Sequence, residues 1–269
     1  MNRRAIVAIV RRDLTLVARA RAVVVPLIVV PLLFFIVFPV LAAFGIRAGG
    51  ELLTEFEPLL DMLPDRIVES LGPGPIESQV MAYVFEYQFA TFFLIVPLMV
   101  CAVIAADSFA GEKERRTLEA LLYSPISDRE LYLAKLLGPW IAAVVVSVAS
   151  YVVYALIVNV LAAPTVGRPL ALSPLWLIVV AWLGPAVGAL AISVLVVVSA
   201  RVRTFQEAYQ LGGAIVLPVV ALVVAQLAGL LVLDALLAVV LGAIVWAIAG
   251  AVLLAASRGF RREALLRQV

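Results

Sequence analysis

Long, continuous runs of apolar residues constrain this chain more than any other sequence feature. A helix needs about 20 apolar residues to cross the hydrocarbon core of a bilayer. The runs do not alternate between apolar and polar residues, so they exclude a transmembrane β-barrel. Charged residues make up only 14% of the chain, whereas they make up about a quarter of a soluble domain. The sequence therefore predicts an all-α integral membrane protein.

Six spans are expected, near residues 22–44, 88–106, 137–161, 174–199, 209–229 and 234–257. The last two come from one run about twice as long as a single crossing requires, so a tight hairpin is expected within it. Only Gly229 and Asp234 interrupt that run. The first run starts after Arg21 and is too long for a cleaved signal peptide, so we expect a retained span. We expect the six spans to form one transmembrane domain over residues 1–269.

The basic residues are distributed unevenly between the segments that connect these spans. Seventeen of the 20 Lys and Arg residues precede the first span, follow the sixth, or lie between spans two and three or four and five. Only Arg47, Arg66 and Arg168 fall on the opposite side. Lys and Arg are enriched in cytoplasmic segments of membrane proteins. We therefore expect a multi-pass protein of the cell membrane with both termini in the cytoplasm.

The segment 45–87 is expected on the outer side and is acidic. Its leucines recur at helical spacing until the Gly-Pro-Gly-Pro run at 72–75, which predicts short amphipathic helices. These helices would lie on the outer leaflet or cap a cavity, and a solvated connector is an equal alternative. Tyr83, Phe85 and Tyr87 resemble an interfacial aromatic belt.

Residues 2–20 precede the first span and carry many arginines. Ile6, Val10, Leu14 and Val17 share one helical face, while the arginines lie elsewhere. This pattern favours an N-terminal amphipathic helix in the cytoplasmic interface, with its cations against lipid phosphates. A basic tail without helical structure is the alternative.

The segment 107–136 combines high charge with helical periodicity on the expected cytoplasmic side. The Ser-Pro pair at 124–125 ends a first helix, because the residue before proline avoids the α region. Ser127 and Glu130 have the spacing of a capping box and predict a second helix that continues into the third span, with a kink at Pro139. The length of the segment and its abrupt turn favour a docking surface for a cytoplasmic partner. A solvated, salt-bridged surface helix is the alternative.

The run Gly-Glu-Lys-Glu-Arg-Arg-Thr-Leu-Glu at 111–119, the Ser-Pro turn and the Arg-Glu-Leu…Lys helix resemble the signature of type-2 ABC exporter permeases. In that family this loop holds a coupling helix, which seats in a groove of a separate ATP-binding subunit. The resemblance implies that six residues help to make this contact: Glu112, Glu114, Arg115, Thr117, Leu118 and Glu119.

A second cytoplasmic loop, residues 199–210, is similar to its equivalent in the same family. The resemblance implies a lesser docking role for Arg201, Arg203 and Glu207. It also implies two partners: an ATP-binding cassette ATPase subunit, and a second copy of the chain or a paralogous permease. No nucleic-acid partner is expected.

Several absences limit the chemistry of the chain itself. It has no phosphate-binding Gly-x-x-x-x-Gly-Lys-Ser/Thr motif, so ATP would be bound by the partner and no cofactor is expected here. It has no histidine and only one cysteine, and we expect no catalytic or metal-binding residues. Glu86, Asp107 and Asp234 are expected only at the margins of spans, which argues against an ion-driven carrier.

These observations favour the membrane-spanning subunit of an ATP-binding cassette exporter. An ATP-independent membrane scaffold or assembly factor and a membrane-embedded lipid-modifying enzyme are the alternatives. The transported substrate is not indicated by any residue pattern.

Overall fold

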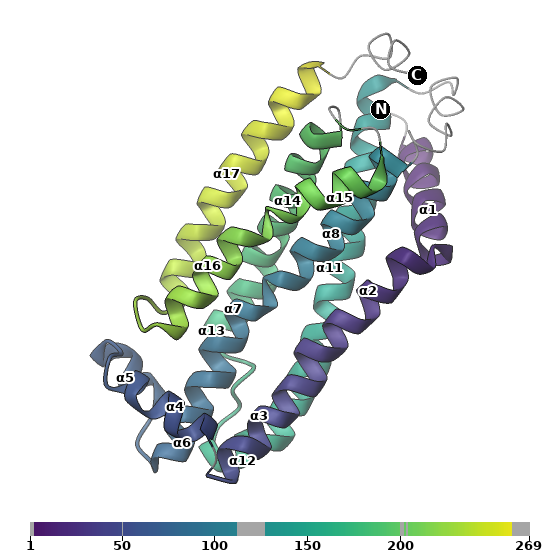
Figure 1. Cartoon of the computed structure of the whole chain (residues 1–269). Coiled ribbons are helices and arrows are strands. Elements are labelled where there is room, and N and C mark those ends of the chain that lie inside the picture. Colours follow the sequence, from purple (N-terminus) through teal and green to yellow (C-terminus); the bar gives the residue numbers. More distant parts are fainter. Residues whose placement is uncertain (1–2, 50, 112–126, 200–201, 203, 260–269) are drawn as a thin grey trace.

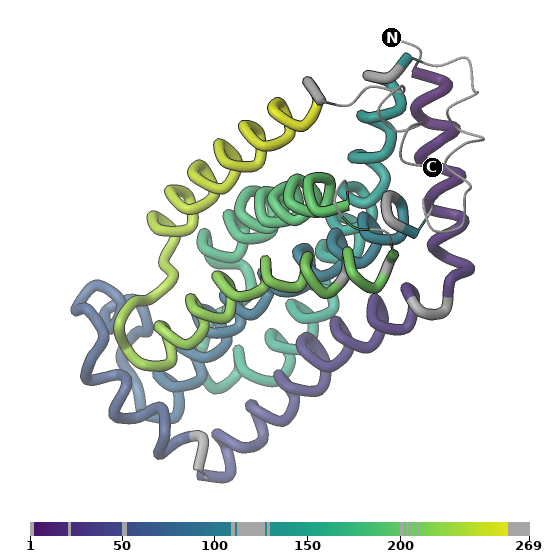
Figure 2. Tube along the Cα trace, turned by 45° about the horizontal axis from the view of Figure 1, so that its top comes forward, coloured from purple at the N-terminus to yellow at the C-terminus, as the bar shows by residue number. Residues whose placement is uncertain are grey.

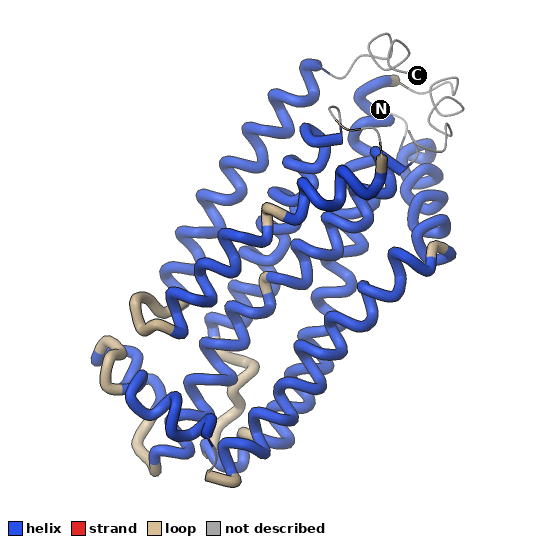
Figure 3. Tube along the Cα trace, in the orientation of Figure 1, coloured by secondary structure: helices blue, strands red, loops and turns tan. Residues whose placement is uncertain are grey.

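The structure is a computed structural model that describes residues 3–49, 51–111, 127–199, 202 and 204–259. The described residues form helices joined by short turns, and none of them is in a strand (Figure 3). Six of the helices within these ranges are long and apolar enough to cross a membrane. The predicted all-α membrane architecture is therefore confirmed.

The N-terminal helix α1 (Arg3–Arg19) is set apart from the first span by a sharp bend at Ala20, whose backbone is extended (Figure 1). The first span then runs without interruption through α2 (Arg21–Leu32), the π-helical segment η1 (Leu33–Val37) and α3 (Phe38–Arg47). Prolines within it remove backbone donors, and spanning helices accommodate this through local π turns.

The second span is formed by α6 (Ile76–Tyr83), η2 (Val84–Gln88), α7 (Phe89–Phe93) and α8 (Ile95–Ala106), and η3 (Asp107–Gly111) extends it. It begins at Ile76 rather than near residue 88. Buried residues make up 83% of its most apolar stretch, compared with 17% of the equivalent stretch in the first span and in the sixth. The second span is therefore the centre of the bundle, and the first and sixth lie at opposite sides of it (Figure 2).

Two short helices precede the second span, α4 (Glu51–Leu60) and α5 (Asp65–Leu71). They lie across one end of the bundle (Figure 1). Their apolar face is buried through Leu59, Ile67 and Leu71. The short amphipathic helices predicted for the segment 45–87 are confirmed, and we refer to α4 and α5 as the cap.

The remaining spans follow in order. The third is α11 (Asp128–Leu161), which continues through Pro139, and the short helix α12 (Ala163–Val166) follows it. The fourth comprises α13 (Pro174–Ile178), η4 (Val179–Leu183) and α14 (Gly184–Ser199). The fifth comprises α15 (Phe205–Gly213) and α16 (Val216–Leu227), and the sixth is α17 (Ala235–Gly259).

The last two spans form the expected hairpin. A turn at residues 228–234 joins α16 to α17, and Gly229 adopts the left-handed backbone conformation, with φ of 69°. A residue with a β-carbon would strain this turn. The side chain of Asp234 accepts the backbone N–H of Leu237 at 2.8 Å and so caps the start of α17.

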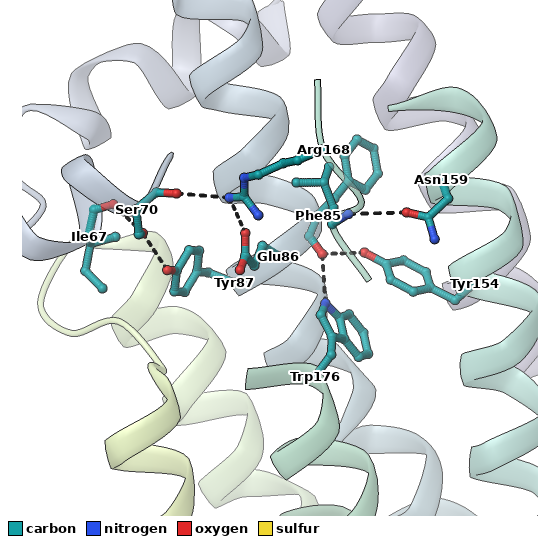
Figure 4. Close-up of polar contacts among 10 residues, drawn as sticks. Ile67, Ser70, Phe85, Glu86, Tyr87, Tyr154, Asn159, Arg168 and Trp176 are labelled. Atoms are coloured by element: carbon teal, nitrogen blue, oxygen red, sulfur yellow. Dashed lines mark hydrogen bonds and ion pairs between the residues drawn. The ribbon is translucent and has the colours of Figure 1, made fainter. Parts of the chain in front are cut away.

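An aromatic cluster fills the core where the second, third and fourth spans meet. In η2 the N–H of Phe89 bonds to the carbonyl of Val84, so the Phe85 carbonyl loses its usual helical donor. It accepts instead from the Tyr154 hydroxyl at 2.6 Å and from the Trp176 indole N–H at 3.2 Å (Figure 4). The π turn therefore exchanges one backbone bond for two side-chain bonds that join three spans.

This arrangement overturns the interpretation of the aromatic residues as an interfacial belt. Tyr83 and Phe85 are fully buried, and Tyr87 is 6% exposed. Because the helix begins earlier than expected, these side chains pack into the bundle interior.

Candidate functional site

The two ends of the bundle carry different features. The end that contains α1 also contains the last residues of η3 and α14, the first residues of α11 and α15, and the end of α17 (Figure 1). The opposite end contains the cap, α12 and the turn between α16 and α17. We refer to these as the α1 end and the cap end. Every segment in which the sequence places a docking residue joins the described helices at the α1 end.

Helix α1 is bound to α11 through an apolar face. Ile6 and Ile9 of α1 form a buried cluster with Leu131 and Ala134 of α11. The buried stripe of α1 continues through Asp13 and Val17. The predicted N-terminal helix is thus present, but its buried face is rotated slightly from the expected one, because α1 packs against protein along this side.

A buried ion pair lies within the same interface. The ammonium of Lys135 on α11 is 3.2 Å from the carboxylate of Asp13 on α1, and the two side chains are only 2% and 4% exposed. The same ammonium donates to the backbone carbonyl of Ser108 in η3 at 3.2 Å. One side chain at the start of the third span therefore contacts both α1 and the end of the second span.

The start of α11 has the geometry that the sequence predicts. The Ser127 hydroxyl accepts the backbone N–H of Glu130 at 3.4 Å, and the Glu130 carboxylate accepts the N–H of Ser127 at 3.0 Å. This capping box is confirmed. The start of α15 is capped in a related way, because the Thr204 hydroxyl accepts the N–H of Glu207 at 3.2 Å.

Of the nine predicted docking residues, Glu207 lies within the described part of the chain, in the first turn of α15 and exposed to solvent. The other eight lie outside the described residues: Glu112, Glu114, Arg115, Thr117, Leu118, Glu119, Arg201 and Arg203. The docking role of all nine stays a prediction.

A second polar site ties the cap end together (Figure 4). The guanidinium of Arg168, in the turn after α12, is 2.6 Å from the buried carboxylate of Glu86 in η2. It also donates to the carbonyl of Ser70 in α5 at 3.0 Å. The Ser70 hydroxyl in turn lies 2.7 Å from the Tyr87 hydroxyl. These contacts join the cap, the second span and the segment between the third and fourth spans.

The other two arginines expected on this side make similar connections. Arg66 of α5 lies 3.5 Å from Asp234, at the start of the sixth span. Arg47, at the end of α3, donates to the carbonyl of Leu161 and to the Thr165 hydroxyl, the latter at 3.2 Å. Each of the three exceptions to the charge asymmetry therefore holds one segment of the cap end to another.

The structure corrects the expectation that Glu86 lies only at the margin of a span, because the second span runs from Ile76 to Ala106. Glu86 lies inside a continuous helix, 6% exposed, and Lys135 is more deeply buried. The sequence contained an indication of the buried ion pair at the α1 end. Ile9, Asp13 and Val17 are spaced four residues apart on one helical face, so the charged Asp13 stands in an otherwise apolar stripe. Its partner 122 residues away is not indicated by any local pattern.

The described residues contain no group of three or more His, Cys, Asp or Glu side chains arranged to hold a metal ion. What the geometry supplies is two polar sites, each at one end of an apolar bundle.

Comparison with known proteins assigns the family. Residues 7–257 match the profile of the family described as ABC-2 family transporter protein. No curated protein sequence matches the chain. The profile covers all six spans together with α1 from residue 7 onwards, the segment 112–126 and the cap. The chain therefore belongs to the ABC-2 transporter family and is a membrane permease component of an ABC transporter.

Proposed function

We propose that this chain is the membrane-spanning permease subunit of an ATP-binding cassette exporter and that a separate ATPase subunit docks at its α1 end. The family match over 7–257 supports a permease, and the lack of a phosphate-binding motif in the sequence indicates that ATP is bound by another chain. Two permease copies, or this chain with a paralogous permease, would form the substrate pathway.

The gathering of helix ends at the α1 end is the observation that carries the proposal. The segments 112–126 and 200–203 are far apart in sequence, yet the helices flanking each of them end or begin at this one end of the bundle (Figure 1). A single partner on this side can therefore reach both segments. Glu207, exposed in the first turn of α15, is placed where such a partner can contact it.

The proposed orientation follows from charge. Arg3, Arg4, Arg11 and Arg12 lie on α1, and the cap end carries the acidic segment 45–87. With the α1 end in the cytoplasm, the basic residues lie on the side where membrane proteins enrich them. The ATPase then meets the permease where ATP is available, in the cell membrane.

Charge reversal in the segment 112–126 tests the docking. The double change Glu112→Lys with Arg115→Glu reverses two charges on the proposed docking helix, and truncating one partner of a buried charged contact at an interface costs about 2–5 kcal/mol. The chain, purified through a tag from its native membrane, should bring down an ATPase subunit, and the double variant should lose it. Glu77→Lys, a change at a half-buried residue of the cap end, is the matched control and should retain the ATPase.

Retention of the ATPase by the double variant would show that this segment is a solvated surface. Absence of any ATPase from the unmodified chain would contradict the proposed function itself and favour an ATP-independent scaffold.

A further inference from the structure

The Lys135 ammonium connects the two helix ends that flank the proposed docking segment 112–126. Ser108, whose carbonyl it binds, lies three residues before the last described residue of η3, Gly111. Lys135 lies in the second turn of α11, which begins at Asp128. We refer to η3 and the start of α11 as the two stems of the segment 112–126. They are joined at one atom, Nζ of Lys135, and that atom also binds Asp13 of α1 at 3.2 Å.

Burial makes these contacts interdependent. A lysine at a membrane surface ordinarily extends its ammonium into water, but the Lys135 side chain is 2% exposed. A buried charge that loses its partner is strongly unfavourable. Moving α1 away from α11 would separate the Asp13 carboxylate from the Lys135 ammonium, and moving η3 away would leave the Ser108 carbonyl without this donor.

The apolar contacts around the ion pair do not impose the same restriction. Ile9 of α1 packs against Leu131 and Ala134 of α11, and such contacts are non-directional. Two apolar helix faces can slide by a fraction of a turn and stay in contact. An ion pair with a hydrogen bond to a fixed carbonyl cannot slide without breaking. The register between the three segments is thus set by Lys135.

We propose that Lys135 is the positioning residue that makes α1 and both stems of the docking segment move as one body when the ATPase subunit acts on the permease. This inference rests on the proposed function, because it takes the ATPase to dock on the segment 112–126. Asp13 fixes α1 to this body through the same ammonium. Force applied at the docking segment is then delivered to the second and third spans and to the N-terminal helix together.

The test measures whether α1 keeps its place on α11 during the ATPase cycle. Spin labels are attached to cysteines at Val7 and Leu133 in an otherwise cysteine-free chain, because these side chains are 65% and 36% exposed on α1 and α11. The distance distribution is recorded for the complex with its ATPase in vesicles, without nucleotide and with ATP trapped. ATP hydrolysis is measured on the same samples.

In the unmodified complex the Val7–Leu133 distribution should be narrow and the same in both states. Lys135→Met keeps the length of the side chain and removes its charge and donors. We expect this variant to retain the ATPase, to show a broader distribution that changes on ATP binding, and to lose permease-dependent ATP hydrolysis by about fivefold or more, the size of typical coupling between sites. Lys135→Arg, which keeps charge and donors, should restore both readouts towards normal.

Ser108→Ala is the matched control, because Ser108 contributes its backbone carbonyl to the contact and the substitution leaves that atom in place. It should behave as the unmodified chain. If Lys135→Met does not yield a folded complex, Asp13→Asn removes the charge of the partner instead and should broaden the same distribution.

Two results would overturn the inference while leaving the proposed function intact. One is an ATPase-bound Lys135→Met complex with an unchanged narrow distribution and unchanged hydrolysis. The other is an unmodified complex in which the Val7–Leu133 distance shifts between nucleotide states. Absence of an ATPase from the unmodified chain would instead contradict the proposed function.

Discussion

The pair of Glu86 and Arg168 offers a quantitative test of how the cap end is held together. The Glu86 side chain is 8% exposed and that of Arg168 is 35% exposed. Arg168→Met keeps an unbranched apolar stem but leaves the Glu86 carboxylate buried without a cation, and it removes the donor to Ser70. Removing one partner of a fully buried pair costs about 3–5 kcal/mol. Because water reaches Arg168, we expect a loss of about 2–4 kcal/mol in the free energy of unfolding.

A double-mutant cycle separates the pair from the individual side chains. Glu86→Gln should cost less, about 1–2 kcal/mol, because the amide still accepts a hydrogen bond and the partly exposed Arg168 can be hydrated. Glu86→Gln combined with Arg168→Met removes both charges and should be destabilising by clearly less than the sum of the two single changes. The measurement is reversible unfolding in mixed micelles, followed by tryptophan fluorescence. Additivity within about 0.5 kcal/mol would refute the coupling between the two side chains.

Two further predictions concern packing and orientation. A β-carbon at Gly242 of α17 would overlap the indole of Trp182, whereas one at Gly250 of the same helix meets no atom within 4 Å. Gly242→Ala should therefore lower the free energy of unfolding by about 1–3 kcal/mol. Gly250→Ala should be neutral or stabilising by up to about 1 kcal/mol. Equal effects of the two substitutions in a thermal melt would contradict this packing. In a cysteine-free chain, a cysteine at Glu77 should react with an impermeant reagent from outside the cell, and one at Arg11 only after permeabilisation; the reverse pattern would invert the orientation.

The sequence was sufficient for the features that depend on local patterns. The six apolar runs, the short helices of the cap and the capping box of Ser127 and Glu130 each depend on residues a few positions apart, and all are present in the structure. The family resemblance was carried by a motif of the same kind, and the family match confirms it.

The features that the sequence did not indicate depend on contacts between distant segments. Asp13 and Lys135 pair across 122 residues, and Glu86 and Arg168 across 82. Periodicity shows which face of a helix is apolar but not which other helix covers it. Sequence patterns also gave a wrong interpretation at the start of the second span. Tyr83 was interpreted as an interfacial residue, but in the structure the surrounding helices bury it completely.

The charged residues of the cap end illustrate the same limit. Counting Lys and Arg indicates which side a segment occupies, and the count treats Arg66 and Arg168 as residual exceptions. In the structure each of them joins the cap to another segment, Arg66 through Asp234 and Arg168 through Glu86. Their presence on the less basic side therefore has a structural reason that only the three-dimensional arrangement shows.

The source of energy for the complex is the most direct test of the whole account. ATP hydrolysis is measured in vesicles that contain the chain alone, the chain with its co-purifying ATPase subunit, or the chain with an ATPase whose phosphate-binding lysine has been changed. A pH-sensitive dye in the lumen reports any ion movement driven by an imposed proton gradient. We predict hydrolysis only in the second preparation, and no response of the chain alone to the gradient. ATP hydrolysis by the chain alone, or proton movement through it driven by the gradient without ATP, would contradict the assignment as a permease driven by a separate ATPase.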